Sequence, residues 1–209
     1  MDNFEKKDIV PENNIGEQPA DEKKQRTDKV YAVQNTILAY LHDLVFVLVG
    51  LLLLFVVLFR IVVVSGPSME NTLRDGDYLL VLSSSVYQNP KQGDIVVISK
   101  DDFKNGEPIV KRVVAVGGQT VRIEEGTVYV DGVKFDDRTT NLYDPPSTFV
   151  VPDGKIFVLG DNRGKSKDSR SSEICMIDKR EVLGKVLVIA FPAVDPTTGK
   201  RDFSRIGAA

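Results

Sequence analysis

The sequence predicts a mainly β protein in which a single N-terminal transmembrane helix precedes an antiparallel β-sheet domain. One uncharged, apolar run at residues 44–59 is long enough, together with its N-terminal flank, to cross a bilayer. After residue 61 the chain consists of short β-rich runs, and pairs of turn-forming residues separate these runs. No convincing amphipathic helix follows residue 59, so we expect the second part of the chain to be built from strands.

The first element is a polar tail over residues 1–36. It is rich in charged residues, contains Pro11 and Pro19, and shows little apolar periodicity. Such a segment buries too little apolar surface to offset the entropy lost on ordering. We therefore expect a disordered tail.

The second element is the membrane anchor, which we expect at residues 37–60. No small-x-small cleavage site follows it, which indicates an uncleaved signal anchor. Positive charge is denser before the span than after it, which favours a cytoplasmic tail and an extracellular β domain. We thus expect a single-pass protein of the cell membrane, in contact with membrane lipid. The basic residues are Lys23, Lys24, Arg26 and Lys29 before the span, and Arg60 and Arg74 after it.

The third element is the β domain, residues 61–209, with a small insertion at about 120–154. Turn pairs such as Asp75-Gly76 and Asp131-Gly132 mark the ends of strands. Residues 138–150, which include Pro145-Pro146, form the least regular stretch and are expected to be a surface loop. The predicted strands lie at residues 78–82, 94–99, 109–116, 121–124, 127–130, 155–159 and 182–191.

Composition excludes several classes of function. The formal net charge is -3, so the chain lacks the basic footprint of a nucleic-acid-binding protein. Cys175 is the only cysteine, which excludes an internal disulfide and a cysteine-cluster metal site. His42 is the only histidine, and the expected topology places it on the cytoplasmic side. We expect no metal, no organic cofactor and no nucleic-acid partner.

Two residues stand out as candidates for chemistry. Ser68 follows Gly66-Pro67, and these two residues can hold a serine in a fixed, exposed turn, although an ordinary loop serine would show the same pattern. Lys111 shares one face of its strand with Ile109 and Val113. Loss of solvation on an apolar face lowers a lysine pKa, and a neutral lysine can take a proton from a serine. The alternative is a lysine that extends to solvent from a sheet edge.

Four segments, in order behind the single anchor, resemble the sequence boxes of type I signal peptidases. They are Gly66-Pro67-Ser68-Met69 with Thr72-Leu73, then Gly76-Asp77, then Lys111-Arg112, and then residues 160–170. The short stretch between the third and fourth boxes is similar to the Gram-positive branch. The resemblance implies a membrane-bound serine endopeptidase that removes signal peptides from exported preproteins. It also implies cleavage after small residues of the Ala-x-Ala type, with a Ser-Lys dyad and an acyl-enzyme.

The resemblance assigns a role to seven polar residues. It further implies that the partners are secretory preproteins and that the protein lies near the protein-export channel. The implied roles are Ser68 as nucleophile, Lys111 as general base, Ser166 as the residue that orients the lysine amine, Asp161 as the partner of Arg112, and Asp168 and Arg170 as braces of their loop.

Three other functions remain open at this point. A self-cleaving repressor-type peptidase also uses a Ser-Lys dyad, but it would carry a DNA-binding domain, and none is visible. A non-catalytic anchored β domain could bind peptides or cell-wall polymers, and it would leave a preprotein uncut. A specialised peptidase that processes a pilin or a conjugation protein would share the same chemistry.

Overall fold

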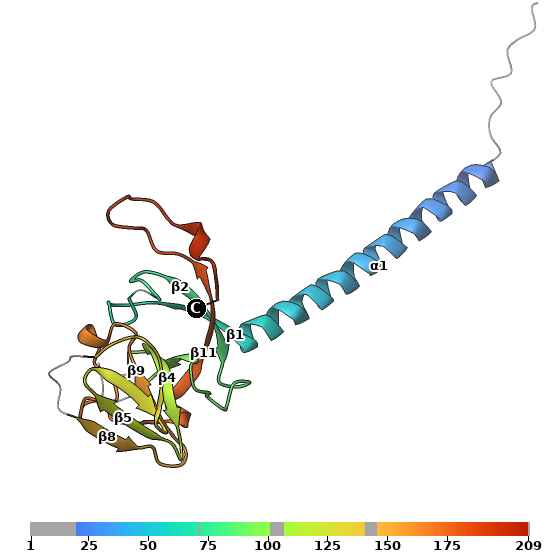
Figure 1. The fold of residues 1–209 in the computed structure, drawn as a ribbon. Helices are drawn as coiled ribbons and strands as arrows, with labels where there is room; N and C mark the ends of the chain where they lie inside the picture. The colour runs from blue at the N-terminus through green and yellow to red at the C-terminus, as the bar shows by residue number, and fades with distance from the viewer. Residues whose placement is uncertain (1–19, 71, 101–106, 141–145, 209) are drawn as a thin grey trace, which may run out of the picture. The chain divides into compact units, whose positions relative to one another are not determined.

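The structure is a computed structural model that describes residues 20–70, 72–100, 107–140 and 146–208. The chain divides into two units, one ending at Leu52 and the other running from Leu53 to Ala209. The predicted class is confirmed: one N-terminal apolar helix precedes two antiparallel sheets (Figure 1).

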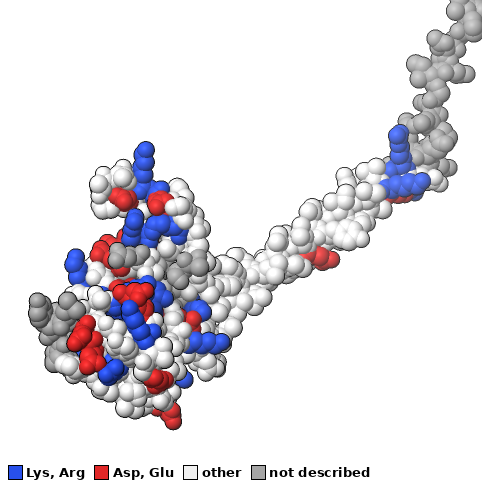
Figure 2. Space-filling view, in the orientation of Figure 1, with Lys and Arg blue, Asp and Glu red and all other residues white. Residues whose placement is uncertain are grey.

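Helix α1 spans Ala20–Leu58, and its part from Lys24 to Leu58 is long and apolar enough to cross a membrane. Its described apolar side chains are exposed as far as Val57, which suits a lipid environment. Figure 2 shows few charged side chains along the helix after its first turns.

The helix differs from the predicted anchor at both ends. Residues 20–36, predicted to be disordered, are helical, because Ala, Glu, Lys and Gln are strong helix formers that extend an existing helix at little cost. At the other end Phe59 and Arg60 belong to a strand, since residue 61 onward is rich in β-branched side chains. Residues 1–19 of the predicted tail lie outside the described residues.

Among the residues that the structure describes, the larger sheet contains eight antiparallel strands. Its order is β1-β2-β11-β3-β4-β9-β10, and β12 pairs with β11. The two strands that matter for the site are β4, inside the sheet, and β1, at one edge. The strands are β1 (Phe59–Val63), β2 (Tyr78–Ser83), β3 (Ile95–Ile98), β4 (Ile109–Val116), β9 (Lys155–Leu159), β10 (Ile177–Asp178), β11 (Val182–Phe191) and β12 (Gly207–Ala208).

In the described part of the insertion near residues 120–154, the chain forms a smaller sheet of four strands in the order β7-β6-β5-β8. Its strands are β5 (Thr120–Glu124), β6 (Thr127–Val130), β7 (Val133–Lys134) and β8 (Ser147–Val150). Three short 3-10 helices complete the described elements: η2 (Arg163–Lys165), η3 (Lys179–Glu181) and η4 (Phe203–Arg205).

The expectation of a loop over residues 138–150 is wrong at its end. Ser147–Val150 forms β8, which pairs with β5 from Thr120 opposite Val150 to Ile123 opposite Ser147. Phe149 anchors this strand, because its ring lies 5.0 Å from the ring of Phe157 in β9. Pro145-Pro146 directly precede β8 and favoured a loop prediction, although the four residues of β8 have ordinary strand propensity.

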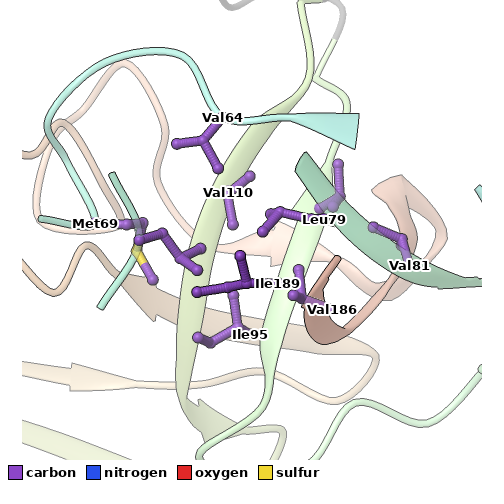
Figure 3. Packing of buried hydrophobic residues seen from close by; sticks show 10 residues of the cluster. Val64, Met69, Leu79, Val81, Ile95, Val110, Val186 and Ile189 are labelled. Carbon is purple, nitrogen blue, oxygen red and sulfur yellow. The ribbon is translucent and has the colours of Figure 1, made fainter. Parts of the chain in front are cut away.

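Three hydrophobic clusters of described residues form the core of the β domain. The first includes Met69 and Leu73, which belong to the connection between β1 and β2 and are buried among residues of β2, β3, β4 and β11 (Figure 3). Burying side chains of this size fixes the connection firmly to the sheet. Ser68 precedes Met69 in this connection, so the fold holds its backbone in place.

Candidate active site

The segment from Val64 to Asp77 carries Ser68 and is closed at its base by backbone hydrogen bonds. The Val64 N–H donates to the Asp77 carbonyl, and the Gly76 N–H donates to the Val64 carbonyl, both at 2.9 Å. Gly66 adopts a φ of 88°, a left-handed conformation that a glycine tolerates, and its N–H donates to Asp75 Oδ1 at 2.7 Å. These contacts set the path of the two residues that lead into Ser68.

Lys111 lies within β4, in the interior of the larger sheet. It pairs with Val96 of β3, and only 3 % of its surface is exposed. Its Nζ lies 2.7 Å from Ser68 Oγ, which is hydrogen-bond distance. The fold of the sheet thus brings together Ser68 and Lys111, which are 43 residues apart in the sequence.

The loop after β9 docks on the Ser68 segment through Asn162. The Asn162 N–H donates to the Ser68 carbonyl at 3.0 Å, and its side-chain amide donates to the Pro67 carbonyl and to Glu70 at 3.1 Å each. The resemblance of the sequence to type I signal peptidases assigned no role to Asn162. The backbone on both sides of the Ser68 hydroxyl is therefore held by a single residue of this loop.

Asp161 and Arg112 form a two-point ion pair between this loop and β4. Nε is 2.8 Å from Oδ1, Nη2 is 2.7 Å from Oδ2, and the Asp161 side chain is fully buried. Thr72 donates to the same carboxylate at 2.5 Å. Burial by itself raises the pKa of the Asp161 carboxyl, but the hydrogen bonds from Arg112 and Thr72 and the charges of Arg112 and Arg138 hold it below its ordinary value.

Asp168 and Arg170 form a second ion pair inside the loop. Arg170 contacts both carboxylate oxygens, at 2.8 and 2.9 Å, and Asp168 accepts a hydrogen bond from the Gly160 N–H at 3.1 Å. The Ser166 hydroxyl lies beside Gly160, so closely that a Cβ at Gly160 would overlap with it and with the Ser68 carbonyl. The Ser166 hydroxyl donates to the Lys167 carbonyl at 3.4 Å, and a hydrogen bond between Ser166 and Lys111 stays a prediction.

Sequence reasoning missed three charged residues that support the site, namely Arg163 in η2, and Asp136 and Arg138, which follow β7 of the smaller sheet. Arg163 is almost fully buried, and it donates to the Gly160 carbonyl at 3.0 Å and to Asp136 at 2.6 Å. Arg138 contacts Asp136 at 3.1 Å and Asp161 at 3.4 Å. No local spacing links these positions, since 27 residues separate Asp136 from Arg163. The burial of a charged side chain became visible only in the folded chain.

A narrow cleft of about 180 Å³ opens beside Ser68 and Lys111. Its walls come from the segment before Ser68, from the start of β4 and from two lysines of the Gly160 loop. Within the parts of the chain that the structure describes, no group of three or more His, Cys, Asp or Glu side chains could hold a metal ion. The cleft is lined by Ser65, Gly66, Pro67, Ser68, Glu107, Pro108, Ile109, Val110, Lys111, Lys165 and Lys167.

A family model described as signal peptidase, peptidase S26, matches residues 37–191, which is most of the chain. The chain belongs to this family. As an S26 signal peptidase it is a serine peptidase and therefore a hydrolase, and α1 supplies the apolar helix expected of a membrane-anchored member. The alternative of a non-catalytic β domain loses its support.

Curated relatives agree with the family match. Signal peptidase I of Bacillus licheniformis is 34% identical over 175 residues, covering 76% of this chain and 91% of that protein. Signal peptidase I T of Bacillus subtilis (strain 168) is 32% identical over 186 residues, covering 82% and 95%. The probable signal peptidase I-1 of Synechocystis sp. is 35% identical over 141 residues, covering 62% and 70%. A solved signal peptidase I from Enterococcus faecalis V583 is 28% identical with a TM-score of 0.39, covering 46% of this chain and 96% of that one.

Proposed function

We propose that this signal peptidase removes signal peptides from secretory preproteins, with Ser68 as nucleophile and Lys111 as general base. The observation that supports this most directly is the 2.7 Å distance between Ser68 Oγ and Lys111 Nζ at the edge of a cleft. A nucleophile within hydrogen-bond reach of its base is the arrangement that covalent catalysis requires.

In the proposed reaction Ser68 Oγ attacks the scissile carbonyl carbon while Lys111 Nζ removes the hydroxyl proton. The tetrahedral intermediate collapses to an acyl-enzyme as Lys111 returns that proton to the leaving amine nitrogen. Lys111 then takes a proton from water as the water oxygen attacks the ester carbonyl. The bond from the acyl carbon to Ser68 Oγ breaks as Lys111 returns that proton to Oγ, which releases the acid product and restores the Ser68 hydroxyl. The Ser68 backbone N–H is our proposed donor to the oxyanion.

The location of Lys111 suits the role of a base. A lysine in water, with a pKa of about 10.4, is neutral in fewer than about one molecule in a thousand at pH 7. Removing an amine from water disfavours its charged form. Lys111 is 3 % exposed, and the buried side chains of Ile109 and Val113 flank it at alternate positions of β4.

The substrate is proposed to bind as an extended strand beside the start of β4. In this stretch β4 pairs with β3 on one side, whereas its pairing with β9 begins only at Arg112. A peptide added at that position would run past Ser68 along the cleft. The cleft volume of about 180 Å³ is below the range of about 300–1,000 Å³ typical of ligand pockets, which favours small side chains such as alanine.

We propose a cytoplasmic N-terminus and an extracellular β domain, because basic residues concentrate before the apolar span. Protease added to intact protoplasts should digest the β domain and spare the N-terminal tail, as followed by antibodies to tags at either end. Digestion of the β domain only after lysis would reverse the orientation.

The decisive assay is cleavage of a purified secretory preprotein by the detergent-solubilised full chain, with the cut located by mass spectrometry. We expect a single cut after a small residue, and no cut by Ser68→Ala. Ser172→Ala, which changes an exposed serine, serves as the matched control and should cleave as the parent does. An intact preprotein, or cleavage by Ser68→Ala, would reject the proposal. A cut confined to a pilin-type substrate would indicate a specialised peptidase.

A further inference from the structure

The segment that follows β7 of the smaller sheet contributes a carboxylate to the support of the active site. Asp136 follows β7, and its Oδ2 lies 2.6 Å from Nη2 of Arg163, which belongs to the loop after β9. The Arg163 side chain is only 1% exposed and that of Asp136 is 14% exposed. This ion pair therefore joins the segment after β7 to the loop after β9 in a poorly solvated environment.

Arg163 carries this contact onward to Gly160. Its Nε donates to the Gly160 carbonyl at 3.0 Å, while the Gly160 N–H donates to Asp168 at 3.1 Å. Both polar groups of this glycine are thus fixed by charged side chains. A charged partner makes such hydrogen bonds stronger than those between neutral groups.

Gly160 lies where the parts of the proposed catalytic machinery meet. A Cβ at this position would overlap with Ser166 Oγ and with the Ser68 carbonyl oxygen. The same Ser68 carbonyl accepts the Asn162 N–H at 3.0 Å. A shift of the Gly160 peptide would therefore displace the backbone of the nucleophile and the hydroxyl beside it.

Asp136 also compensates the charge of Arg163. Burial lowers the pKa of the Arg163 guanidinium, and the carboxylate of Asp136 opposes that effect. A second arginine, Arg138, contacts the same Asp136 carboxylate at 3.1 Å and reaches Asp161 at 3.4 Å. The carboxylate of Asp136 therefore lies between Arg163, which belongs to the loop after β9, and Arg138, which contacts Asp161 of that loop.

We infer that Asp136 is a positioning residue for the Ser68–Lys111 dyad, acting through Arg163 on the Gly160 peptide. Asp136 does not line the cleft, so its effect should fall on the turnover step and not on substrate binding. Misplacement of reacting groups by about 1 Å can cost about a hundredfold in rate. The inference rests on the proposed function, because it presumes that Ser68 is the nucleophile.

The test compares Asp136→Asn with Asp137→Asn in the solubilised full chain. Asp137 is a matched control, since its side chain is 99% exposed and it pairs only with the exposed Lys134 among the contacts of the described chain. At a temperature where each variant is folded, we expect Asp136→Asn to lower kcat at least about tenfold with KM unchanged. Asp137→Asn should match the parent. A parental kcat in Asp136→Asn would overturn the inference.

A double variant, Asp136→Asn with Arg163→Met, separates positioning from charge compensation. It removes both charges, so folding stability should recover relative to Asp136→Asn. It also removes the donor to the Gly160 carbonyl, so kcat should stay low. Recovery of kcat together with the melting temperature would show a purely structural ion pair. If neither variant folds, the pair is a requirement of the fold and the positioning role is rejected.

The proposed function can fail separately from this inference. Cleavage that persists in Ser68→Ala would reject the proposed nucleophile and, with it, the role of Asp136 in positioning the dyad. Loss of cleavage in Ser68→Ala, combined with a parental kcat in Asp136→Asn, would reject only the role of Asp136.

Discussion

The guanidinium of Arg112 and the carboxylate of Asp161 face each other edge to edge, with Nε 2.8 Å from Oδ1 and Nη2 2.7 Å from Oδ2. This geometry ties β4, which carries Lys111, to the loop that contacts the Ser68 segment. Because the Asp161 side chain is fully buried, solvent cannot replace a lost partner.

We expect Asp161→Ala to reduce the free energy of unfolding by about 3–5 kcal/mol, since it leaves the Arg112 charge without its buried partner. Cleavage activity should fall as well. Glu124→Ala, which removes an ion pair to Arg122 with both side chains more than 40% exposed, should change stability little. Denaturant unfolding of the three proteins measures the difference, and equal midpoints for Asp161→Ala and the parent would contradict it.

The C-terminal segment is fastened to the base of the Ser68 connection through Asp77. Arg205 contacts both carboxylate oxygens, at 2.9 and 2.8 Å, and the Ala193 N–H donates to Oδ1 at 2.7 Å. Burial acts to raise the pKa of the Asp77 carboxyl, but the hydrogen bonds from Arg205, Ala193 and Arg74 hold it below its ordinary value. The unfolded chain therefore binds a proton at higher pH than the folded chain does.

This shift predicts a pH dependence of stability. The contribution of Asp77 is fully present above the unfolded pKa of about 3.9 and is lost as the pH falls through the lower folded pKa. The difference in melting temperature between the parent and Asp77→Asn should thus be largest near neutral pH and shrink below about pH 4. A difference that stays constant down to acid unfolding would show that the Asp77 charge is irrelevant.

Gly160 and Gly164, both in the loop after β9, allow the effect of one added methyl group to be compared at a crowded and at an open position. Gly160→Ala should severely impair cleavage, because a methyl group there overlaps with Ser166 and with the Ser68 carbonyl. Gly164→Ala adds the same methyl group where no atom lies within 4 Å. Steady-state cleavage and the melting temperature should both distinguish the two variants. Comparable activity in both would contradict the tight packing at Gly160.

The proposed dyad predicts non-additive effects. Ser68→Ala and Lys111→Ala should each abolish cleavage, and the double variant should be no worse than either, because the two residues act as one unit. Lys155→Ala, which removes an exposed lysine of β9, is the control and should cleave normally. The parental rate should rise with pH as a single group deprotonates. Substantial cleavage by a folded Lys111→Ala protein would exclude the dyad.

The larger strands were predictable because their signals are local. β-branched runs bounded by Gly-containing turns indicated the positions of β2, β3, β4, β5, β6, β9 and β11, each within about a residue at either end. Strands of two residues, such as β7 and β10, have no periodicity to detect. The start of α1 was missed because propensity extends a helix beyond its apolar part.

Site residues were also predictable only where their signal is local in the sequence. Ser68, Lys111, Arg112 and Asp161 belong to short segments whose resemblance to a family was visible in the sequence. Asp136 acts on the site through Arg163, which lies 27 residues further along the chain, and the sequence predicted only a small insertion in the region of Asp136. Whether Asp136 and Arg163 meet depends on how the segment after β7 packs against the loop after β9. Local patterns in the sequence carry no information about that packing.

The buried charge of Arg163 also constrains how the chain can change. Its compensating carboxylate belongs to the insertion, so the insertion cannot be replaced as an interchangeable module. A chimaera that takes its smaller sheet from a relative without a carboxylate at position 136 would enclose an uncompensated guanidinium. Substitutions at positions 136 and 163 should therefore be inherited together, and a sheet transplant should succeed only when both positions move as a pair.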